Sequence, residues 1–169
     1  MNDRSVTYCE KHGVTEMRCC GVEISGSDVV LVIVDRDAGG YAYAPTNPRM
    51  INLGDDEDQD VVRSFYETVA TFLRDNHVDL VAIKKRASKG KFAGSSVSFK
   101  IEALLQIMND HKVKIYSAST IAAKNKSLKF HISKEVFGYQ KAAYLTACCA
   151  LASQDVVVSS VEPTSASQG

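Results

Sequence analysis

The sequence predicts an α/β domain in which a mixed five-stranded sheet is flanked by helices. Two observations support this prediction. First, the apolar segments 17–24 and 28–35 are joined by a three-residue link that contains Gly26, which is typical of an antiparallel hairpin. Second, helical and strand patterns alternate along the rest of the chain, as they do in α/β sheets covered by helices. The chain has 169 residues, a length typical of one domain.

The first half of the chain is predicted to form a three-stranded meander. Residues 28–35 are almost continuously apolar and rich in valine, as expected of a strand buried on both faces. Residues 41–44 alternate as a short third strand. Pro45 and Pro48 then predict an end to regular strand pairing, because proline lacks the backbone N–H that a sheet requires.

A helix is predicted over residues 59–76, whose apolar side chains recur at three- and four-residue intervals. The acidic run at residues 55–60 precedes it, where carboxylates complement the positive end of a helix dipole. A strand is predicted next over residues 80–83, then a helix over residues 95–108 and a strand over residues 113–116. A short helix capped by Ser119 follows at residues 119–124, and a final helix of small residues at residues 139–153.

Composition restricts the classes of protein to consider. Residues 1–16 form a polar N-terminal extension without a signal-peptide core, and no apolar run reaches the ~20 residues that span a bilayer. The five cysteines show no disulfide framework spacing. We therefore expect a cytoplasmic protein. Its folded domain is expected over residues 17–153, followed by a disordered tail at residues 154–169 that is polar in its last part.

The formal net charge of zero conceals a strong asymmetry. Residues 84–141 contain 13 Lys and Arg against three acidic residues, so the rest of the chain is acidic by the same net amount. A basic segment of this kind is typical of a surface that meets a polyanion, although many charge runs are simply solvated.

The basic segment opens with a loop that suits anion binding. The apolar strand at residues 80–83 runs into basic residues and glycines, and a helix is predicted to start just after them. Free amides at a helix start, with glycines that allow close approach, form a typical phosphate site. A solvated basic turn is the alternative. The residues expected to contact phosphate or nucleic acid are Lys85, Arg86, Lys89, Gly90, Lys91, Phe92, Gly94, Ser95, Ser96 and, from the final helix, Lys141. Phe92 would either stack on a base or anchor the loop.

The predicted order of elements resembles the ribonuclease H-like fold, and in particular its RuvC-like branch. Gly21-Val22-Glu23 stands where the opening strand of that branch reads Gly-Ile-Asp. Lys84 stands where the branch carries a glutamate, and Lys141 or Ala142 where it carries an aspartate. The chain also resembles a narrower, uncharacterised bacterial family that shares Gly-Val-Glu and the sequence Lys-Gly-Lys-Phe-Ala-Gly at residues 89–94.

The resemblance implies a site related to that of two-metal nucleases, in which carboxylates hold the metal ions. Glu23 would supply the first ligand, whereas the charge of Lys84 opposes a cation. We therefore expect a nucleic-acid-binding protein with a degenerate metal site, weak Mg²⁺ or Mn²⁺ binding through Glu23 at most, and no efficient nuclease activity. Glu23 and Lys84 are the candidate catalytic pair, or a structural ion pair.

Two alternatives remain at this point. One is a nuclease with a rearranged carboxylate set that draws on Asp28, Asp35 or Asp37. The other is a module that binds a nucleotide or a protein. The sequence does not choose between DNA and RNA, and it does not reveal the oligomeric state.

Overall fold

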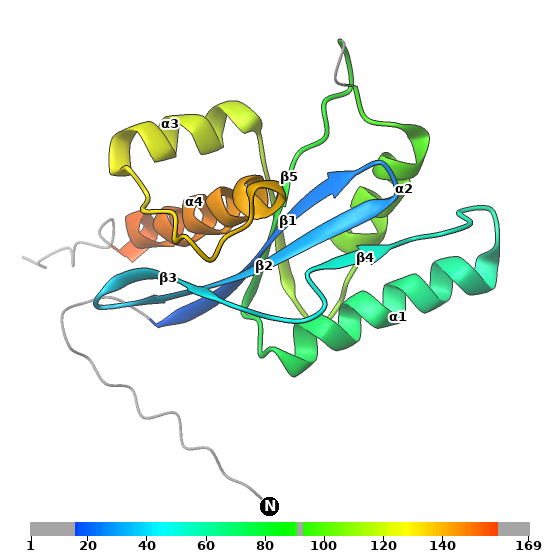
Figure 1. Cartoon of the computed structure of the whole chain (residues 1–169), viewed down its shortest axis with the longest axis horizontal. Helices are drawn as coiled ribbons and strands as arrows, with labels where there is room; N and C mark the ends of the chain where they lie inside the picture. The colour runs from blue at the N-terminus through cyan, green and yellow to red at the C-terminus, as the bar shows by residue number, and fades with distance from the viewer. Residues whose placement is uncertain (1–15, 91–92, 159–169) are drawn as a thin grey trace, which may run out of the picture.

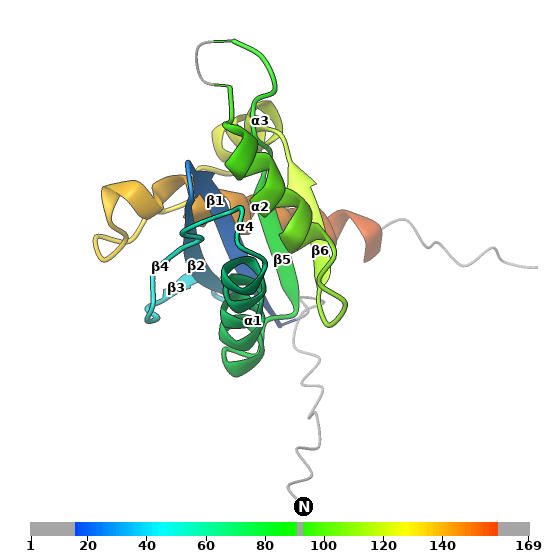
Figure 2. The ribbon, with the colours of Figure 1, turned by 90° about the vertical axis from the view of Figure 1, so that its right-hand side faces the viewer.

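The computed structural model describes residues 16–90 and 93–158, which form a sheet covered by helices on both faces (Figures 1 and 2). Helices α1 and α2 lie on one face, α4 lies on the other, and α3 packs beside α4. Within these ranges, no helix is both long and apolar enough to cross a membrane.

The elements in chain order are β1 (Met17–Ser25), β2 (Asp28–Asp37), β3 (Gly40–Ala44), β4 (Met50–Asn52), α1 (Gln59–Asp75), β5 (Leu80–Lys84), α2 (Ser96–Gln106), β6 (Lys112–Tyr116), α3 (Ala118–Leu128), the 3-10 turn η1 (Gly138–Gln140) and α4 (Lys141–Val158).

The sheet is mixed, as predicted, but it has six strands and not five. The order is β3-β2-β1-β5-β6, with β1, β5 and β6 parallel and the hairpin strands antiparallel. The additional strand β4 pairs with the first residues of β2, while β3 pairs with the last ones. Pro45 and Pro48 do interrupt the pairing, but the chain then rejoins the same edge, where the backbone N–H of Leu31 donates to the carbonyl of Arg49 at 3.0 Å.

Both boundaries of two predicted helices change. Helix α3 is capped by Ser117, whose Oγ accepts from the N–H of Thr120 at 3.1 Å, and it continues to Leu128. Ser119 therefore lies within the helix and is not its cap. Helix α4 starts at Lys141, after η1, and runs to Val158, beyond the predicted end at residue 153.

The acidic run before α1 has the role that the helix dipole predicts. Asp58 is the N-cap, and its carboxylate accepts from the N–H groups of Asp60 and Val61 at 2.8 and 3.2 Å. Asp56 forms an ion pair with Lys100 of α2 at 2.6 Å. The carboxylates at this helix start therefore have structural partners.

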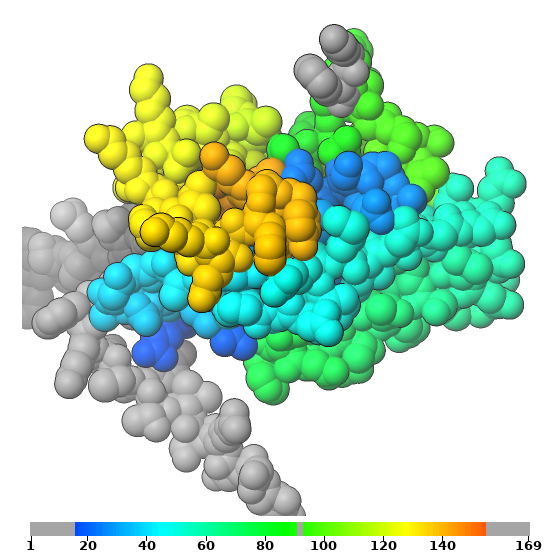
Figure 3. Space-filling model, in the orientation of Figure 1, coloured from blue at the N-terminus to red at the C-terminus, as the bar shows by residue number. Residues whose placement is uncertain are grey.

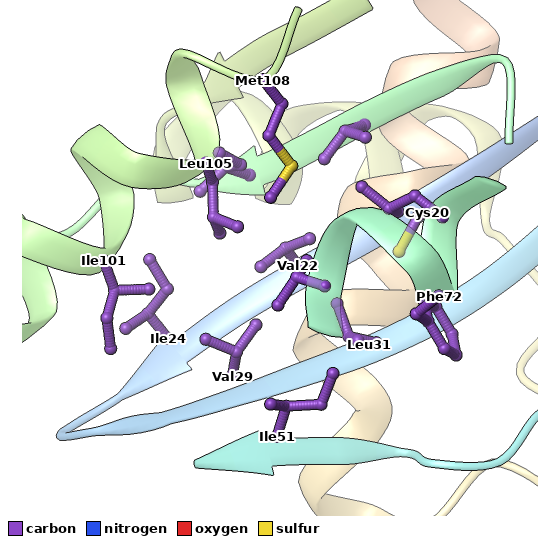
Figure 4. Close-up of a cluster of buried hydrophobic side chains, with 14 of the residues drawn as sticks. Cys20, Val22, Ile24, Val29, Leu31, Ile51, Phe72, Ile101, Leu105 and Met108 are labelled. Carbon is purple, nitrogen blue, oxygen red and sulfur yellow. The ribbon is translucent and has the colours of Figure 1, made fainter. Parts of the chain in front are cut away.

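Alternate side chains of each central strand enter two separate cores. On one face, Cys20, Val22 and Ile24 of β1 pack against residues of α1 and α2 such as Phe72 and Leu105 (Figure 4). On the other face, the alternate residues of the same strands pack against α4. Burial of each large apolar side chain contributes about 1.5–3 kcal/mol to folding. The strands are therefore apolar on both faces, as the sequence predicts.

Helix α4 approaches the sheet so closely that its backbone touches β1. A Cβ atom placed on Gly21 would lie 1.9 Å from the carbonyl oxygen of Ala143 and 2.9 Å from the Cβ of Ala147. Glycine is required at this position because any side chain would overlap the helix. The small residues of α4 permit this contact, and the first turn of the helix is thereby fixed over the middle of β1.

The Gly21→Ala substitution should lower the free energy of unfolding by about 3 kcal/mol, because α4 must move away from the sheet. Urea unfolding followed by circular dichroism measures this loss. Gly138→Ala is the matched control, since its Cβ would meet nothing within 4 Å. Equal stability of the two variants would contradict the close contact.

Candidate nucleic-acid interface

Glu23 and Lys84 meet just beyond the last paired residues of the parallel strands β1 and β5. Val22 of β1 lies opposite Ile83 of β5, so the next residue of each strand leaves the ladder at the same end of the sheet. The Nζ of Lys84 donates to Oε1 of Glu23 at 2.8 Å. The two side chains are 29% and 21% exposed, respectively, so that most of the pair is shielded from water.

The pair lies on the face that α4 covers. Gly21 and Ala82, two residues before Glu23 and Lys84, both face this helix, and strand side chains alternate with a period of two. The first turn of α4 rests on Gly21 through Ala143. The exposed residue Lys141, which begins α4, is therefore placed on the same side of the sheet as the ion pair.

The residues around Glu23 do not fit a two-metal site. Its carboxylate already faces a cation, and the described part of the chain holds no cluster of three or more His, Cys, Asp or Glu suited to a metal ion. The carboxylates considered as replacements have other partners. Asp35 accepts from Arg18 at 2.7 Å, Asp37 from the N–H of Gly39 at 2.7 Å, and Asp28 from Asn52 at 2.7 Å.

Tyr116, which lies opposite Lys84 on β6, offers no base to replace these carboxylates. Burial raises the pKa of its hydroxyl to about 12, so the phenol stays neutral at physiological pH. Its backbone carbonyl accepts from the N–H of Lys85 at 2.8 Å and extends the β5–β6 pairing by one residue.

The loop between β5 and α2 presents part of the predicted basic surface. The side chains of Lys85 and Lys89 are exposed, as is Gly90, whose φ of 91° requires a residue without a side chain. Lys91 and Phe92 lie outside the described residues.

Ser95 and Ser96 are exposed where the loop meets α2. The Oγ of Ser95 caps the helix by accepting from the N–H of Ser98 at 3.3 Å. The Oγ of Ser98 in turn donates to the carbonyl of Ser95 at 2.8 Å. The predicted helix start therefore lies at the end of the loop.

Two predicted contact residues, Arg86 and Gly94, also hold the loop in place. The guanidinium of Arg86 donates to the carbonyl of Ile24, and its backbone N–H donates to Glu102 at 3.0 Å. Gly94 donates to the carbonyl of Ala87 at 2.7 Å, and a Cβ there would lie 3.3 Å from the Cβ of Arg86. A role of either residue in binding nucleic acid stays a prediction.

Sequence reasoning missed an aromatic pair next to the start of α4. Phe137 and Tyr139 are 48% and 47% exposed, and their rings stack with centroids 5.9 Å apart. The available signal was the presence of two aromatic residues separated by one glycine, between Lys134 and Lys141.

A hairpin followed by parallel strands, with helices on both faces, is the architecture of the ribonuclease H-like fold. Two solved structures of RuvC from Thermus thermophilus share this architecture. One matches with a TM-score of 0.59 and 13% identity, covering 82% of this chain and 96% of that one. The other, in complex with a Holliday junction substrate, matches with a TM-score of 0.56 and 12% identity, covering 82% and 95%. At these identities the likeness establishes the fold.

The chain belongs to the family described as protein of unknown function (DUF3010), whose model matches residues 17–150. No curated protein matches it by sequence. The predicted ribonuclease H-like, RuvC-like fold is thus confirmed, within an uncharacterised family.

The ion pair should contribute measurably to stability. A double-mutant cycle of Glu23→Gln and Lys84→Met should give a coupling free energy of about 1–2 kcal/mol in urea unfolding, because a hydrogen bond between charged groups is partly shielded from water here. The cycle of Asp60→Asn and Arg63→Met is the control. That pair is 3.5 Å apart with side chains 90% and 63% exposed, and its coupling should stay below about 0.5 kcal/mol. Similar coupling free energies in both cycles would show that the Glu23–Lys84 ion pair is no more stabilising than an exposed pair.

Proposed function

We propose that this protein binds nucleic acid at the end of the sheet where β1, β5 and β6 finish, and that it is not an efficient nuclease. One observation carries the proposal. In a RuvC-like fold, the Nζ of Lys84 lies 2.8 Å from the carboxylate of Glu23, at the strand end where the family resemblance leads one to expect a second carboxylate. A fixed cation therefore stands where a metal ion would need two negative ligands.

The size of the electrostatic effect supports the absence of a working metal site. Two unit charges 4 Å apart interact by about 4 kcal/mol at an effective dielectric constant of 20. Lys84 both neutralises Glu23 and repels a divalent cation near it. The surface that remains has positive charge and hydrogen-bond donors, which bind phosphate without catalysing its transfer.

The distribution of charge supports a polyanionic partner. Lys85, Lys89 and Lys141 are exposed and form no ion pair with the described residues, so their charges are available to phosphate groups. Helices α2 and α3 both start after strands that end at this edge, at Ser95 and Ser117. Their first-turn amides add further donors for anions. The similar RuvC structure that holds a Holliday junction substrate makes nucleic acid the preferred polyanion.

The alternatives find less support. A rearranged carboxylate site would need acidic residues near Glu23, and the described residues place none in a metal-binding group. Among the described residues, no contact or cavity specifically favours a nucleotide or a protein as the ligand. The choice between DNA and RNA and the cytoplasmic location stay predictions from the sequence.

The affinity for a labelled oligonucleotide should fall as salt rises, with a log–log slope of about −0.7 to −0.9 for each phosphate contacted. Fluorescence anisotropy across a salt series measures this slope. The double variant Lys85→Ala/Lys89→Ala should make the slope shallower by about 1.4–1.8, because each lysine contacts one phosphate. The control Arg63→Ala/Arg74→Ala removes the same charge from α1 and should leave the slope unchanged.

Two outcomes would count against the proposal. If no DNA or RNA binds at low salt, the protein has another partner. If the α1 control weakens binding as much as the lysine variant does, the attraction reflects only total charge and not this surface.

A further inference from the structure

An aromatic pair is exposed on a rigid turn just before α4. Phe137 is the N-cap residue of η1, and its backbone N–H donates to Oε1 of Gln140 at 3.2 Å. Gln140 is only 1% exposed, and its side chain also contacts the hydroxyl of Tyr43 at 3.4 Å. The turn is therefore held to the sheet by a buried amide while its two rings point outward. About half of each ring remains exposed, so the fold leaves unused part of the ~1.5–3 kcal/mol that full burial of a large apolar side chain contributes.

The geometry of the rings suits stacking. The planes of Phe137 and Tyr139 are inclined by only 15°, with centroids 5.9 Å apart, an offset arrangement that aromatic pairs prefer. Arg49, from the segment between β3 and β4, places its guanidinium 4.8 Å from the centroid of the Phe137 ring. The Nε of Arg49 is buried and has no hydrogen-bond partner among the described residues.

The pair lies close to the proposed nucleic-acid surface. Lys141 follows η1 directly and begins α4, whose first turn rests on Gly21, two residues before Glu23. Figure 3 shows the start of α4, in orange, on the same face of the molecule as the blue β1–β2 turn beside it. Neither Arg49 nor Lys141 forms an ion pair with the described residues, so two positive charges lie near the rings without a carboxylate partner. Between residues 130 and 145, Glu135 is the one acidic residue of the sequence.

We propose that Phe137 and Tyr139 form a stacking platform for an unpaired nucleobase, with Lys141 placed to contact a neighbouring phosphate. This inference rests on the proposed nucleic-acid binding and specifies its substrate class as nucleic acid with unpaired bases. Flat exposed rings accompanied by cations are the arrangement with which proteins bind single strands, because every base has a face that stacks on an aromatic ring. A fully paired duplex keeps its bases stacked on one another and cannot use the platform.

Single-strand affinity tests the platform against the basic loop. The variants Phe137→Leu and Tyr139→Leu should each weaken the binding of an oligothymidylate by about 5- to 150-fold, the range for loss of one stacked base, and should change duplex binding much less. Phe137→Trp should retain single-strand affinity. Ile107→Ala, which removes a 64% exposed apolar side chain at the end of α2, is the matched control and should have no effect.

Photocrosslinking tests where the base binds in the wild-type chain, without any substitution. Trypsin cleaves after Lys134 and Lys141, so the peptide of residues 135–141 carries both rings and no other aromatic residue. An oligothymidylate that contains 5-iodouracil should crosslink to this peptide, as detected by mass spectrometry. Crosslinks found only on other peptides would overturn the platform even if a variant failed to fold.

The two proposals fail in different ways. If the chain binds single strand and the Lys85→Ala/Lys89→Ala variant weakens that binding while both leucine variants have no effect, the platform is wrong and the basic interface stands. If the chain binds neither single strand nor duplex, both proposals are wrong, and the aromatic pair would then serve contact with another protein.

Discussion

The contact between Gly21 and Ala143 determines how the rest of the structure is arranged. The carbonyl oxygen of Ala143 lies 1.9 Å from the place of a Cβ atom on Gly21, so the helix can neither tilt nor slide without losing the contact. Through it, the start of α4 is placed two residues from Glu23, and the turn with Phe137 and Tyr139 is placed beside the sheet. The alanines and cysteines of α4 are explained by the same requirement, because larger residues would hold the helix away from the strand.

The ion pair between Glu23 and Lys84 determines what this end of the sheet can do. The β1–β5 pairing ends at Val22 and Ile83, so the next side chains of the two strands lie together, and in this chain they carry opposite charges. The result is a local charge of zero at the position where a metal-dependent enzyme needs several negative charges. Lys85 and Lys89 of the β5–α2 loop and Lys141 at the start of α4 are exposed, and the proposed function assigns them to phosphate binding.

Much of the fold could be predicted from local pattern. The strands around residues 17–35 and 80–83 were correct because long apolar runs need burial on both faces, and the start of α2 was correct because Ser95 caps it. Strand β4 was missed because its three residues depend on backbone bonds to β2, such as Leu31 to Arg49, which no local pattern encodes.

The candidate site also has features that the sequence predicts and features that only the structure reveals. The pairing of Glu23 with Lys84 is open to sequence reasoning once both are placed at the ends of adjacent strands, and the structure forms that pair. The contacts of Arg86 with Ile24 and of Arg49 with Phe137 join residues 62 and 88 positions apart, and no periodicity links them. Long-range side-chain contacts of this kind depend on how loops cross the finished sheet, so they become visible only in three dimensions.

In the proposed function, Lys84 takes the place of a metal ion beside Glu23. Titration of Mn²⁺ into the protein by isothermal calorimetry, compared with the Lys84→Glu variant, tests it most directly. We expect no saturable binding to the native chain and a clear gain of affinity in Lys84→Glu, because that exchange makes the local charge more negative by two units. Tight Mn²⁺ binding by the native chain that disappears in Glu23→Ala, together with Mn²⁺-dependent cleavage of nucleic acid, would contradict it.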